Sequence, residues 1–230
     1  MRLRRAGTTA AAHTVPRKPR AYEESINSRR NGRANRVASP KKREQEIIDA
    51  AAEIFHRQGY SDTSVQNVAD AVGILKGSLY YYIDSKDDLL YRVLLEVHDA
   101  AHMILEEVAA MEGLSPLERL DAYVRRHVEY NIENLTKIAV YYHDYKLLTP
   151  ERRAEIRRQR RLYEDFVEGL VSEAQQQGEV AADLDPAVLS YCLFGALNSV
   201  YTWYRPGRKV SATQLADTLA RFVLSAVRTD

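Results

Sequence analysis

The 230-residue sequence has few of the residues that mark secreted, membrane or metal-binding proteins. Its single cysteine, Cys192, has no partner in the chain for a disulfide, and no Cys/His cluster has zinc-finger spacing. No run of about 18 apolar residues occurs, and the basic N-terminus lacks the apolar centre of a signal peptide. We therefore expect a cytoplasmic protein without a membrane partner.

Catalytic motifs are missing as well. The sequence contains no nucleophile with a neighbouring base, no HExxH and no glycine-rich phosphate loop. His98 and His102 are spaced four apart, as some metal ligands are, but no third ligand accompanies them, so we interpret them as an ordinary histidine pair. The sequence predicts no enzyme activity, no metal site and no required cofactor.

The net charge of +1 conceals an uneven distribution. Of 33 Lys/Arg and 32 Asp/Glu in total, residues 1–40 hold ten and two, which leaves 23 and 30 for the remainder. Residues 1–40 show no apolar periodicity, so we expect a disordered basic tail. Two interpretations fit such a tail: an arm that follows DNA phosphates non-specifically, or an expendable extension.

From residue 39 onward, apolar residues recur at helical spacing and no alternating strand pattern occurs. Capping residues, prolines at helix starts and glycines at helix ends together predict nine helices and an all-α fold. The predicted starts are Ser39-Pro40, Thr63 with Gln66, the stretch after Gly73, Ser85 with Asp88, Ser115-Pro116, a break near Asn134, Thr149-Pro150, Asp185-Pro186, and Ser211 with Gln214.

The second and third predicted helices, joined by a tight turn at Gly73, have the pattern of a helix-turn-helix, whose second helix enters the DNA major groove. In "KGSLYYYI" of the third helix, Leu79 and Ile83 share one side, which we expect to be buried. The remaining side offers phosphate-binding groups and a glycine that permits close approach to the bases: Lys76, Gly77, Ser78, Tyr80, Tyr81 and Tyr82. Lys86 begins the next helix, where another phosphate could bind.

Two observations count against DNA binding by this stretch. Tyrosines also pack against neighbouring helices, which we expect in part for Tyr80. Residues 41–88 moreover hold nine Asp/Glu against six Lys/Arg, so DNA binding would depend on where the charges lie and on the tail.

The run from Ile47 to Leu90 resembles the DNA-binding domain of the TetR family of one-component bacterial transcriptional regulators. The motifs that carry the resemblance are "AAAEIFHRQGY", "TSVQNVADAVG", "KGSLYYY" and "SKDDLL". It implies a nine-helix homodimer that binds a palindromic operator in double-stranded DNA and is released by a ligand. Together with the composition shift near residue 40, it implies three regions: a tail at 1–40, a helix-turn-helix domain at 41–88 and a ligand-binding and dimerisation domain at 89–230. The DNA contacts that it implies are Ser64, Lys76, Gly77, Ser78, Tyr80, Tyr81, Tyr82 and Lys86.

Two positions depart from the pattern of the family. Leu75 stands where a Ser or Thr usually caps the third helix, and Ile83 replaces a usual Phe. The first change leaves the helix without its cap and removes a phosphate contact. The second should only repack the core.

The segment "WYRPGRKVSATQLADTLARFVLSAV", Trp203 to Val227, is similar to the end of a TetR subgroup that responds to acyl-CoA thioesters and governs fatty-acid or steroid breakdown. The alternative is that this segment is only a helix end, a turn and a packed helix, without any role in effector recognition. The resemblance implies a lipid-like effector, with an acyl-CoA as the candidate.

Clustered tyrosines can line an apolar cavity that still offers hydroxyls, although they are also ordinary core residues. The candidate pocket residues are Met103, Tyr123, His127, Tyr130, Tyr141, Tyr142, Tyr145, Phe166 and Phe194.

Arginines in the seventh predicted helix could bind the phosphates of coenzyme A, since Arg157 and Arg161 share one face. The alternative is a solvated face neutralised by nearby Asp and Glu residues.

The eighth and ninth helices carry enough apolar residues to form a two-fold four-helix bundle. The residues expected there are Leu189, Leu193, Leu197, Val200, Tyr201, Tyr204, Leu215, Leu219, Phe222, Val223 and Ala226.

The sequence thus predicts a ligand-responsive repressor of lipid or steroid catabolism genes. Two alternatives stay open. One is an efflux-type regulator that senses hydrophobic toxic compounds, and the other is an all-helical carrier or enzyme that does not bind DNA.

Overall fold

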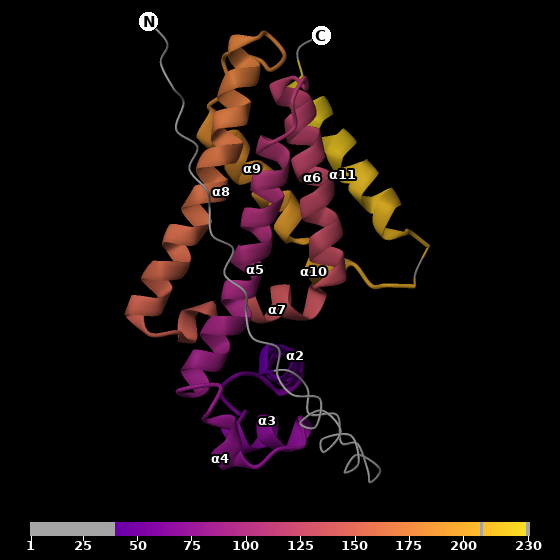
Figure 1. Cartoon of the computed structure of the whole chain (residues 1–230). Helices are drawn as coiled ribbons and strands as arrows, with labels where there is room; N and C mark the ends of the chain where they lie inside the picture. The colour runs from indigo at the N-terminus through magenta and orange to yellow at the C-terminus, as the bar shows by residue number, and fades with distance from the viewer. Residues whose placement is uncertain (1–39, 208, 229–230) are drawn as a thin grey trace, which may run out of the picture. The chain divides into compact units, whose positions relative to one another are not determined.

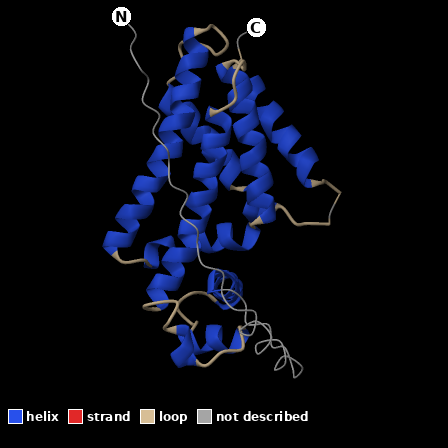
Figure 2. Ribbon diagram, viewed as in Figure 1, coloured by secondary structure: helices blue, strands red, loops and turns tan. Residues whose placement is uncertain are grey.

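The computed structural model describes residues 40–207 and 209–228, and every regular element in this part of the chain is a helix (Figures 1 and 2). Its one β pairing is an isolated antiparallel bridge between Val180 and Arg228. The elements are α2 (Pro40–Gln58), α3 (Val65–Ala71), α4 (Lys76–Leu79), α5 (Lys86–Ala109), α6 (Pro116–Glu133), α7 (Leu135–Asp144), the 3-10 helix η1 (Tyr145–Leu147), α8 (Pro150–Gln176), α9 (Pro186–Asn198), α10 (Val200–Trp203) and α11 (Ala212–Val227).

The structure confirms the predicted all-α class. The predicted basic tail and the predicted cap at Ser39 lie outside the described residues. No helix among residues 40–207 and 209–228 is both long enough and apolar enough to cross a membrane.

Most predicted helix starts are confirmed by their caps. The side chains of Ser85, Ser115, Thr149, Asp185 and Ser211 each accept a hydrogen bond from a backbone N–H of the following turn. Each bond satisfies a donor that has no partner within the helix, so the local sequence alone fixes where these helices begin.

The start of α3 was predicted one residue too early. Ser64 is the N-cap and forms a reciprocal capping box with Asn67. The hydroxyl of Thr63 instead donates to the carbonyl of Gly59 at 2.7 Å and is buried. The prediction was wrong because Thr63 and Ser64 are both good caps, and the hydrogen bonds of Thr63 to Gly59 and Gln58 at the end of α2 separate them.

The eighth predicted helix is divided at Ser199 into α9 and α10. The hydroxyl of Ser199 donates to the carbonyl of Ala196 at 2.9 Å. Such bonds compete with the backbone hydrogen bonds of a helix. At the end of α10, the Arg205 guanidinium donates to the carbonyls of Tyr201, Thr202 and Tyr204, so this arginine caps the helix.

Two clusters of buried residues form the core. The first joins α2, α3, α4 and the start of α5, and it also includes Val140 and Tyr141 of α7, Leu148, and Ile156 of α8. The second lies among α5, α6, α8, α9, α10 and α11, with α11 packed along α6 (Figure 1). We call residues 40–83 the head and residues 86–228 the body. Since α7 and α8 contribute to the first cluster, the head shares its core with the body.

Candidate DNA-contact and effector sites

The α4 segment has one buried and one exposed side. Leu79 and Ile83 are buried in the head, whereas the Tyr81 side chain is 89% exposed. Lys76, Gly77 and Tyr80 are exposed, and Ser78 and Tyr82 are half-buried. The helix α4 follows the left-handed turn at Gly73, whose φ is 70°. Of the residues predicted to contact DNA, Lys76, Gly77 and Ser78 lie on α4 and Tyr80, Tyr81 and Tyr82 directly follow it, whereas Ser64 caps α3 and Lys86 begins α5.

Gly77 is not required by the packing of the subunit. A Cβ atom built at this position would meet no atom within 4 Å among the described residues. An alanine would be the better helix former by about 1 kcal/mol. The space in front of Gly77 therefore suits the close approach of another molecule.

The N-terminus of α4 has no side-chain cap, since its N-cap residue is Leu75, which is largely exposed. Leu75 was expected to leave this helix uncapped, and the structure shows the same arrangement. Ser64 is exposed at the start of α3, where its hydroxyl bonds to Asn67. Since the one hydroxyl proton of Ser64 is donated to Oδ1 of Asn67, a phosphate contact from this hydroxyl would compete with that bond.

Lys86 has hydrogen-bond partners within the subunit that the sequence did not predict. Its Nζ donates to the carbonyls of Tyr60 at 2.9 Å, Ser61 at 3.2 Å and Thr63 at 2.8 Å, and it lies 4.3 Å from the centre of the Tyr60 ring. An ammonium group has three protons. A phosphate contact from Lys86 would therefore compete with one of these carbonyls.

The body contains a small, partly open cavity of about 20 Å³. Half-buried and buried polar side chains supply much of its wall. The residues that line it are Val97, Ala101, Ile104, His127, Tyr130, Asn131, Ile138, Tyr141, Tyr142, Tyr163 and Asn198. Its volume accommodates about one water molecule, so a larger effector must widen it.

Several predicted pocket residues meet at this cavity. His127, Tyr130, Tyr141 and Tyr142 line it directly. Three further predicted residues form the adjoining aromatic shell: the Tyr123 ring centre lies 5.7 Å from that of His127, 6.1 Å from Phe166 and 6.3 Å from Phe194.

Two predicted pocket residues lie elsewhere. The Met103 side chain is 58% exposed on α5. Tyr145 packs against the core of the head, and its hydroxyl donates to the carbonyl of Arg153 at 3.3 Å. Sequence reasoning missed Asn131, Tyr163 and Asn198, because nothing in the local pattern shows that α6, α8 and α9 bring them to the same cavity.

The two buried histidines near the cavity are held neutral. Burial lowers the pKa of His127 to about 4, although the hydrogen bond to Asn198 partly opposes the shift. Burial also lowers the pKa of His98 to about 4, with a smaller contribution from the charges of His102 and Arg160. His98 stacks on Tyr163 at 5.8 Å and meets Tyr141 edge to face at 5.2 Å, so it lies one ring behind the cavity wall.

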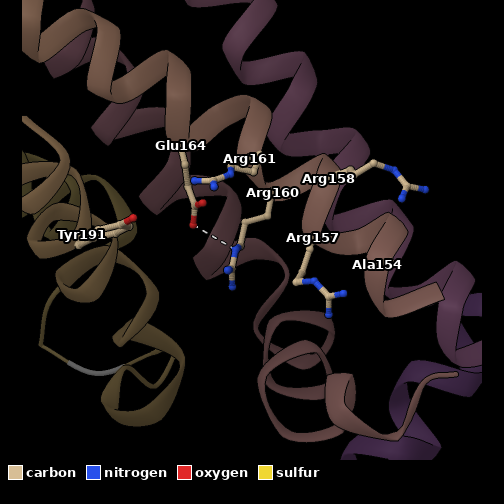
Figure 3. A pocket seen from close by; sticks show the side chains of 7 residues that line it. All are labelled: Ala154, Arg157, Arg158, Arg160, Arg161, Glu164 and Tyr191. Atoms are coloured by element: carbon tan, nitrogen blue, oxygen red, sulfur yellow. Dashed lines mark ion pairs between the residues drawn. The ribbon is translucent and has the colours of Figure 1, made fainter. Parts of the chain in front are cut away.

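A second, open pocket of about 520 Å³ lies along α8 and carries a cluster of arginines (Figure 3). Its lining residues are Ala154, Arg157, Arg158, Arg160, Arg161, Glu164 and Tyr191. Arg157 and Arg160 extend from the same side of α8, while Arg158 extends the other way (Figure 3). Arg160 pairs with Glu164 at 3.0 Å, and Arg157 and Arg161 are exposed.

Arg160 connects the two pockets. Burial raises the pKa of Tyr141 to about 12, and the nearby Arg160 guanidinium partly opposes that shift. Tyr142, which also lines the cavity, stacks on Tyr201 at 5.2 Å and is partly exposed. Arg160 therefore interacts with Tyr141 in the wall of the cavity, although the two pockets share no lining residue.

The expected dimer residues lie mainly in the core of the subunit. Leu193, Leu197, Val200, Tyr204, Leu215 and Val223 are all buried there. The large apolar side chains that α9 and α11 leave exposed are Val188, Tyr191 and Phe222. Periodicity identified apolar helices, but it did not separate the side that packs within the subunit from the outer side.

Comparison with known proteins identifies two matched regions in the chain. Residues 47–93 match the family model of bacterial regulatory proteins of the tetR family, and residues 113–227 match the tetracyclin repressor-like C-terminal domain. The HTH-type transcriptional repressor KstR2 of Rhodococcus jostii is 30% identical over 80% of this chain and 89% of that protein. The chain belongs to the TetR family.

Solved structures of TetR proteins share this architecture. AibR, in complex with isovaleryl coenzyme A and operator DNA, is 29% identical with a TM-score of 0.71, covering 78% of this chain and 97% of that one. The ketosteroid transcriptional regulator KstR2 of Mycobacterium tuberculosis has a TM-score of 0.76 over 84% of this chain and 97% of that one, and at 24% identity it shows the fold alone.

Membership of the TetR family confirms the coarser part of the prediction from the sequence, a ligand-responsive DNA-binding regulator. TetR proteins are ligand-responsive transcriptional regulators that bind operator DNA, and they are not enzymes. The α3–α4 pair of this chain lies within the matched DNA-binding region, and the cavity and the arginine pocket draw residues from the matched C-terminal region.

Proposed function

We propose that this TetR protein is a homodimeric repressor that binds a palindromic operator through the outer side of α4 and is released by an acyl-CoA thioester. The genes under its control would serve lipid or steroid catabolism. The observation that carries the proposal is the position of Arg160, which belongs to the arginine pocket and also lies beside Tyr141 of the buried cavity.

The two pockets match the two halves of an acyl-CoA. Guanidinium groups form charge-assisted hydrogen bonds with phosphates, which suits Arg157, Arg160 and Arg161 to the coenzyme A moiety. The acyl group would pass Tyr142 and enter the cavity among α5, α6, α7 and α8. The name of one relative agrees with this class of effector, since AibR was solved in complex with isovaleryl coenzyme A.

Release would follow from the size of the cavity. Because a cavity of about 20 Å³ cannot hold an acyl group, binding would favour a conformer in which α7 has moved from its present position. Residues of α7 belong to the core of the head, so the head would move with it. The effect of the ligand is limited to its difference in affinity for the two conformers.

Dimerisation would place the two heads on one duplex. We propose that the exposed side of α9 and α11, with Val188, Tyr191 and Phe222, forms the two-fold interface. Two recognition helices then meet successive major grooves at a separation of about 34–36 Å or a multiple of it.

A displacement assay tests this proposal. The operator is first selected from random duplexes with the purified protein, and its release is followed by fluorescence anisotropy during titration with acyl-CoA thioesters, free coenzyme A and the free acids. We expect release by a thioester but not by its separate halves, and weaker release from an Arg157→Ala, Arg161→Ala variant that still binds the operator. Release by cationic or neutral aromatic compounds, with no response to thioesters, would support an efflux-type regulator instead.

A further inference from the structure

We propose that the effector's acyl group carries a neutral keto or hydroxyl oxygen away from the thioester, and that His127 and Tyr123 bind this oxygen with His98 behind them. This inference rests on the proposed function and narrows it to one class of acyl group. It would make the protein a sensor of oxygenated acyl chains that responds weakly to saturated ones.

The starting observation is a group of buried polar atoms without partners. Nδ1 of His127, the hydroxyl of Tyr123 and both ring nitrogens of His98 have no hydrogen-bond partner among residues 40–207 and 209–228. Tyr123 and His98 are fully buried and His127 nearly so. Most buried polar side-chain atoms in proteins are paired, so a bound ligand group that pairs with these atoms would be stabilised here.

The rings that carry these atoms belong to one aromatic cluster, of which His127 reaches the cavity wall. His127 lines the cavity, and its Nε2 is 3.1 Å from Oδ1 of Asn198, which leaves Nδ1 as the unpaired atom. Tyr123 is next to His127, with ring centres 5.7 Å apart. His98 lies behind the wall residues Tyr141 and Tyr163.

The available atoms define which ligand groups can bind. The Tyr123 hydroxyl is a donor that suits a keto oxygen. Nδ1 of His127 is an acceptor when Nε2 carries the proton, and it then suits a ligand hydroxyl. A saturated chain offers neither, so it would leave these atoms buried and unpaired.

The oxygen must belong to an uncharged group. None of the described residues that line the cavity is Lys, Arg, Asp or Glu. Burial keeps His127 and His98 neutral at pH 7 by lowering the pKa of each to about 4. A carboxylate at the end of the acyl chain would therefore be buried without a counter-ion, which is strongly unfavourable.

The size of the expected preference follows from the cost of unpaired atoms. Leaving one buried donor or acceptor unsatisfied costs about 1–3 kcal/mol, and about 1.4 kcal/mol corresponds to tenfold in affinity. We therefore expect a keto or hydroxy acyl-CoA to release the operator at a concentration about tenfold or more below that of the saturated thioester with the same chain length.

Tyr123→Phe separates ligand binding from folding. The substitution removes an unpaired buried hydroxyl, so the melting temperature of the free protein should stay the same or rise. The same substitution should reduce the preference for the keto thioester toward equality, an effect that a merely structural hydroxyl would not have. His127→Leu should reduce the preference for the hydroxy thioester, whereas His56→Leu, at an exposed site on the head, should leave both preferences unchanged.

The experiment measures release of the selected operator by a saturated acyl-CoA and by its keto and hydroxy derivatives of equal length, with the wild-type protein and the three variants. The inference is supported by a preference for the oxygenated thioesters that Tyr123→Phe weakens without loss of thermal stability. Equal potency of saturated and oxygenated thioesters, or a preference that Tyr123→Phe leaves intact, overturns the inference while the proposed function stands. A failure of every thioester to release the operator overturns both.

Discussion

The ammonium nitrogen of Lys137 lies 2.7 Å from Oδ1 of Asp49, and this ion pair joins α7 of the body to α2 of the head. The same nitrogen lies 2.7 Å from Oε2 of Glu96 on α5. Burial acts to lower the pKa of Lys137, but the hydrogen bonds and charges of both carboxylates outweigh it and raise the pKa. Because α7 also carries the cavity residues Tyr141 and Tyr142, Lys137 connects the effector site to the head.

Lys137→Met should therefore weaken operator binding by the effector-free protein. A partly exposed ion pair contributes up to about 1 kcal/mol, which predicts a reduction in affinity of up to about fivefold. The matched control is Lys146→Met on η1, at an exposed position. Anisotropy titrations of both variants check the prediction, and equal affinities of Lys137→Met and wild type would show that the ion pair does not position the head.

Gly77→Ala should stabilise the subunit and weaken its binding to DNA. The added methyl group meets no atom of the subunit, and alanine favours the helix by about 1 kcal/mol. On the operator, the same methyl group would hold α4 away from the bases. Gly169→Ala on α8 is the control, since it too has open space around the added Cβ and should gain stability without losing affinity. Thermal denaturation and operator titration are measured for both variants, and undiminished affinity of Gly77→Ala would argue against close approach at this position.

The buried histidines predict loss of stability in acid. Burial lowers the pKa of His98 and His127 from the ordinary 6.5 to about 4, so the unfolded chain binds more protons between these values. The free energy of unfolding should be fully retained above pH 6.5 and should fall as the pH drops toward 4, by about 2 kcal/mol per histidine at about pH 5. Urea denaturation at a series of pH values measures this loss. His127→Leu should reduce the pH dependence of the free energy of unfolding by the contribution of one histidine. If this dependence is unchanged in the variant, the pKa of His127 is not lowered in the folded protein.

Phe222→Glu should dissociate the proposed dimer while leaving the subunit folded. The Phe222 side chain is 64% exposed on α11, so it adds little to the core of its own subunit. A charge in the middle of an apolar interface is costly, and loss of the dimer should reduce operator affinity by more than about tenfold. Sedimentation measures the subunit number, with Leu147→Glu on η1 as the control.

Cys192 provides an independent test of the same interface. It is the only cysteine in the chain and is exposed on α9, next to Tyr191. A thiol reagent should label it slowly in the dimer and rapidly in the Phe222→Glu variant. Rapid labelling of a dimeric wild-type protein would place the interface elsewhere.

Local features of the fold could be predicted from the sequence because they depend on neighbouring residues. The caps at Ser115 and Ser211 and the left-handed turn at Gly73 are each decided within a few positions. The two sides of α4 likewise follow from helical spacing, which placed Leu79 inside and Tyr81 outside.

The candidate sites could be predicted only in part, because they combine distant residues. Asn131 and Asn198 reach one cavity from α6 and α9, and no short pattern links them. Lys86 binds carbonyls more than 20 positions earlier in the chain, an arrangement that depends on how α5 packs against the head. Which side of α9 and α11 packs within the subunit likewise depends on contacts between residues that are distant in the sequence.

The most direct test of the account is the affinity of a variant with Lys76→Ala and Tyr81→Ala for the selected operator at low salt. Both side chains are exposed, so the variant should fold and dimerise as the wild type does. If the outer side of α4 contacts DNA, operator affinity should fall by more than about tenfold while thermal stability is kept. Wild-type affinity in the folded, dimeric variant would contradict the account, because DNA binding would then not use this side of α4.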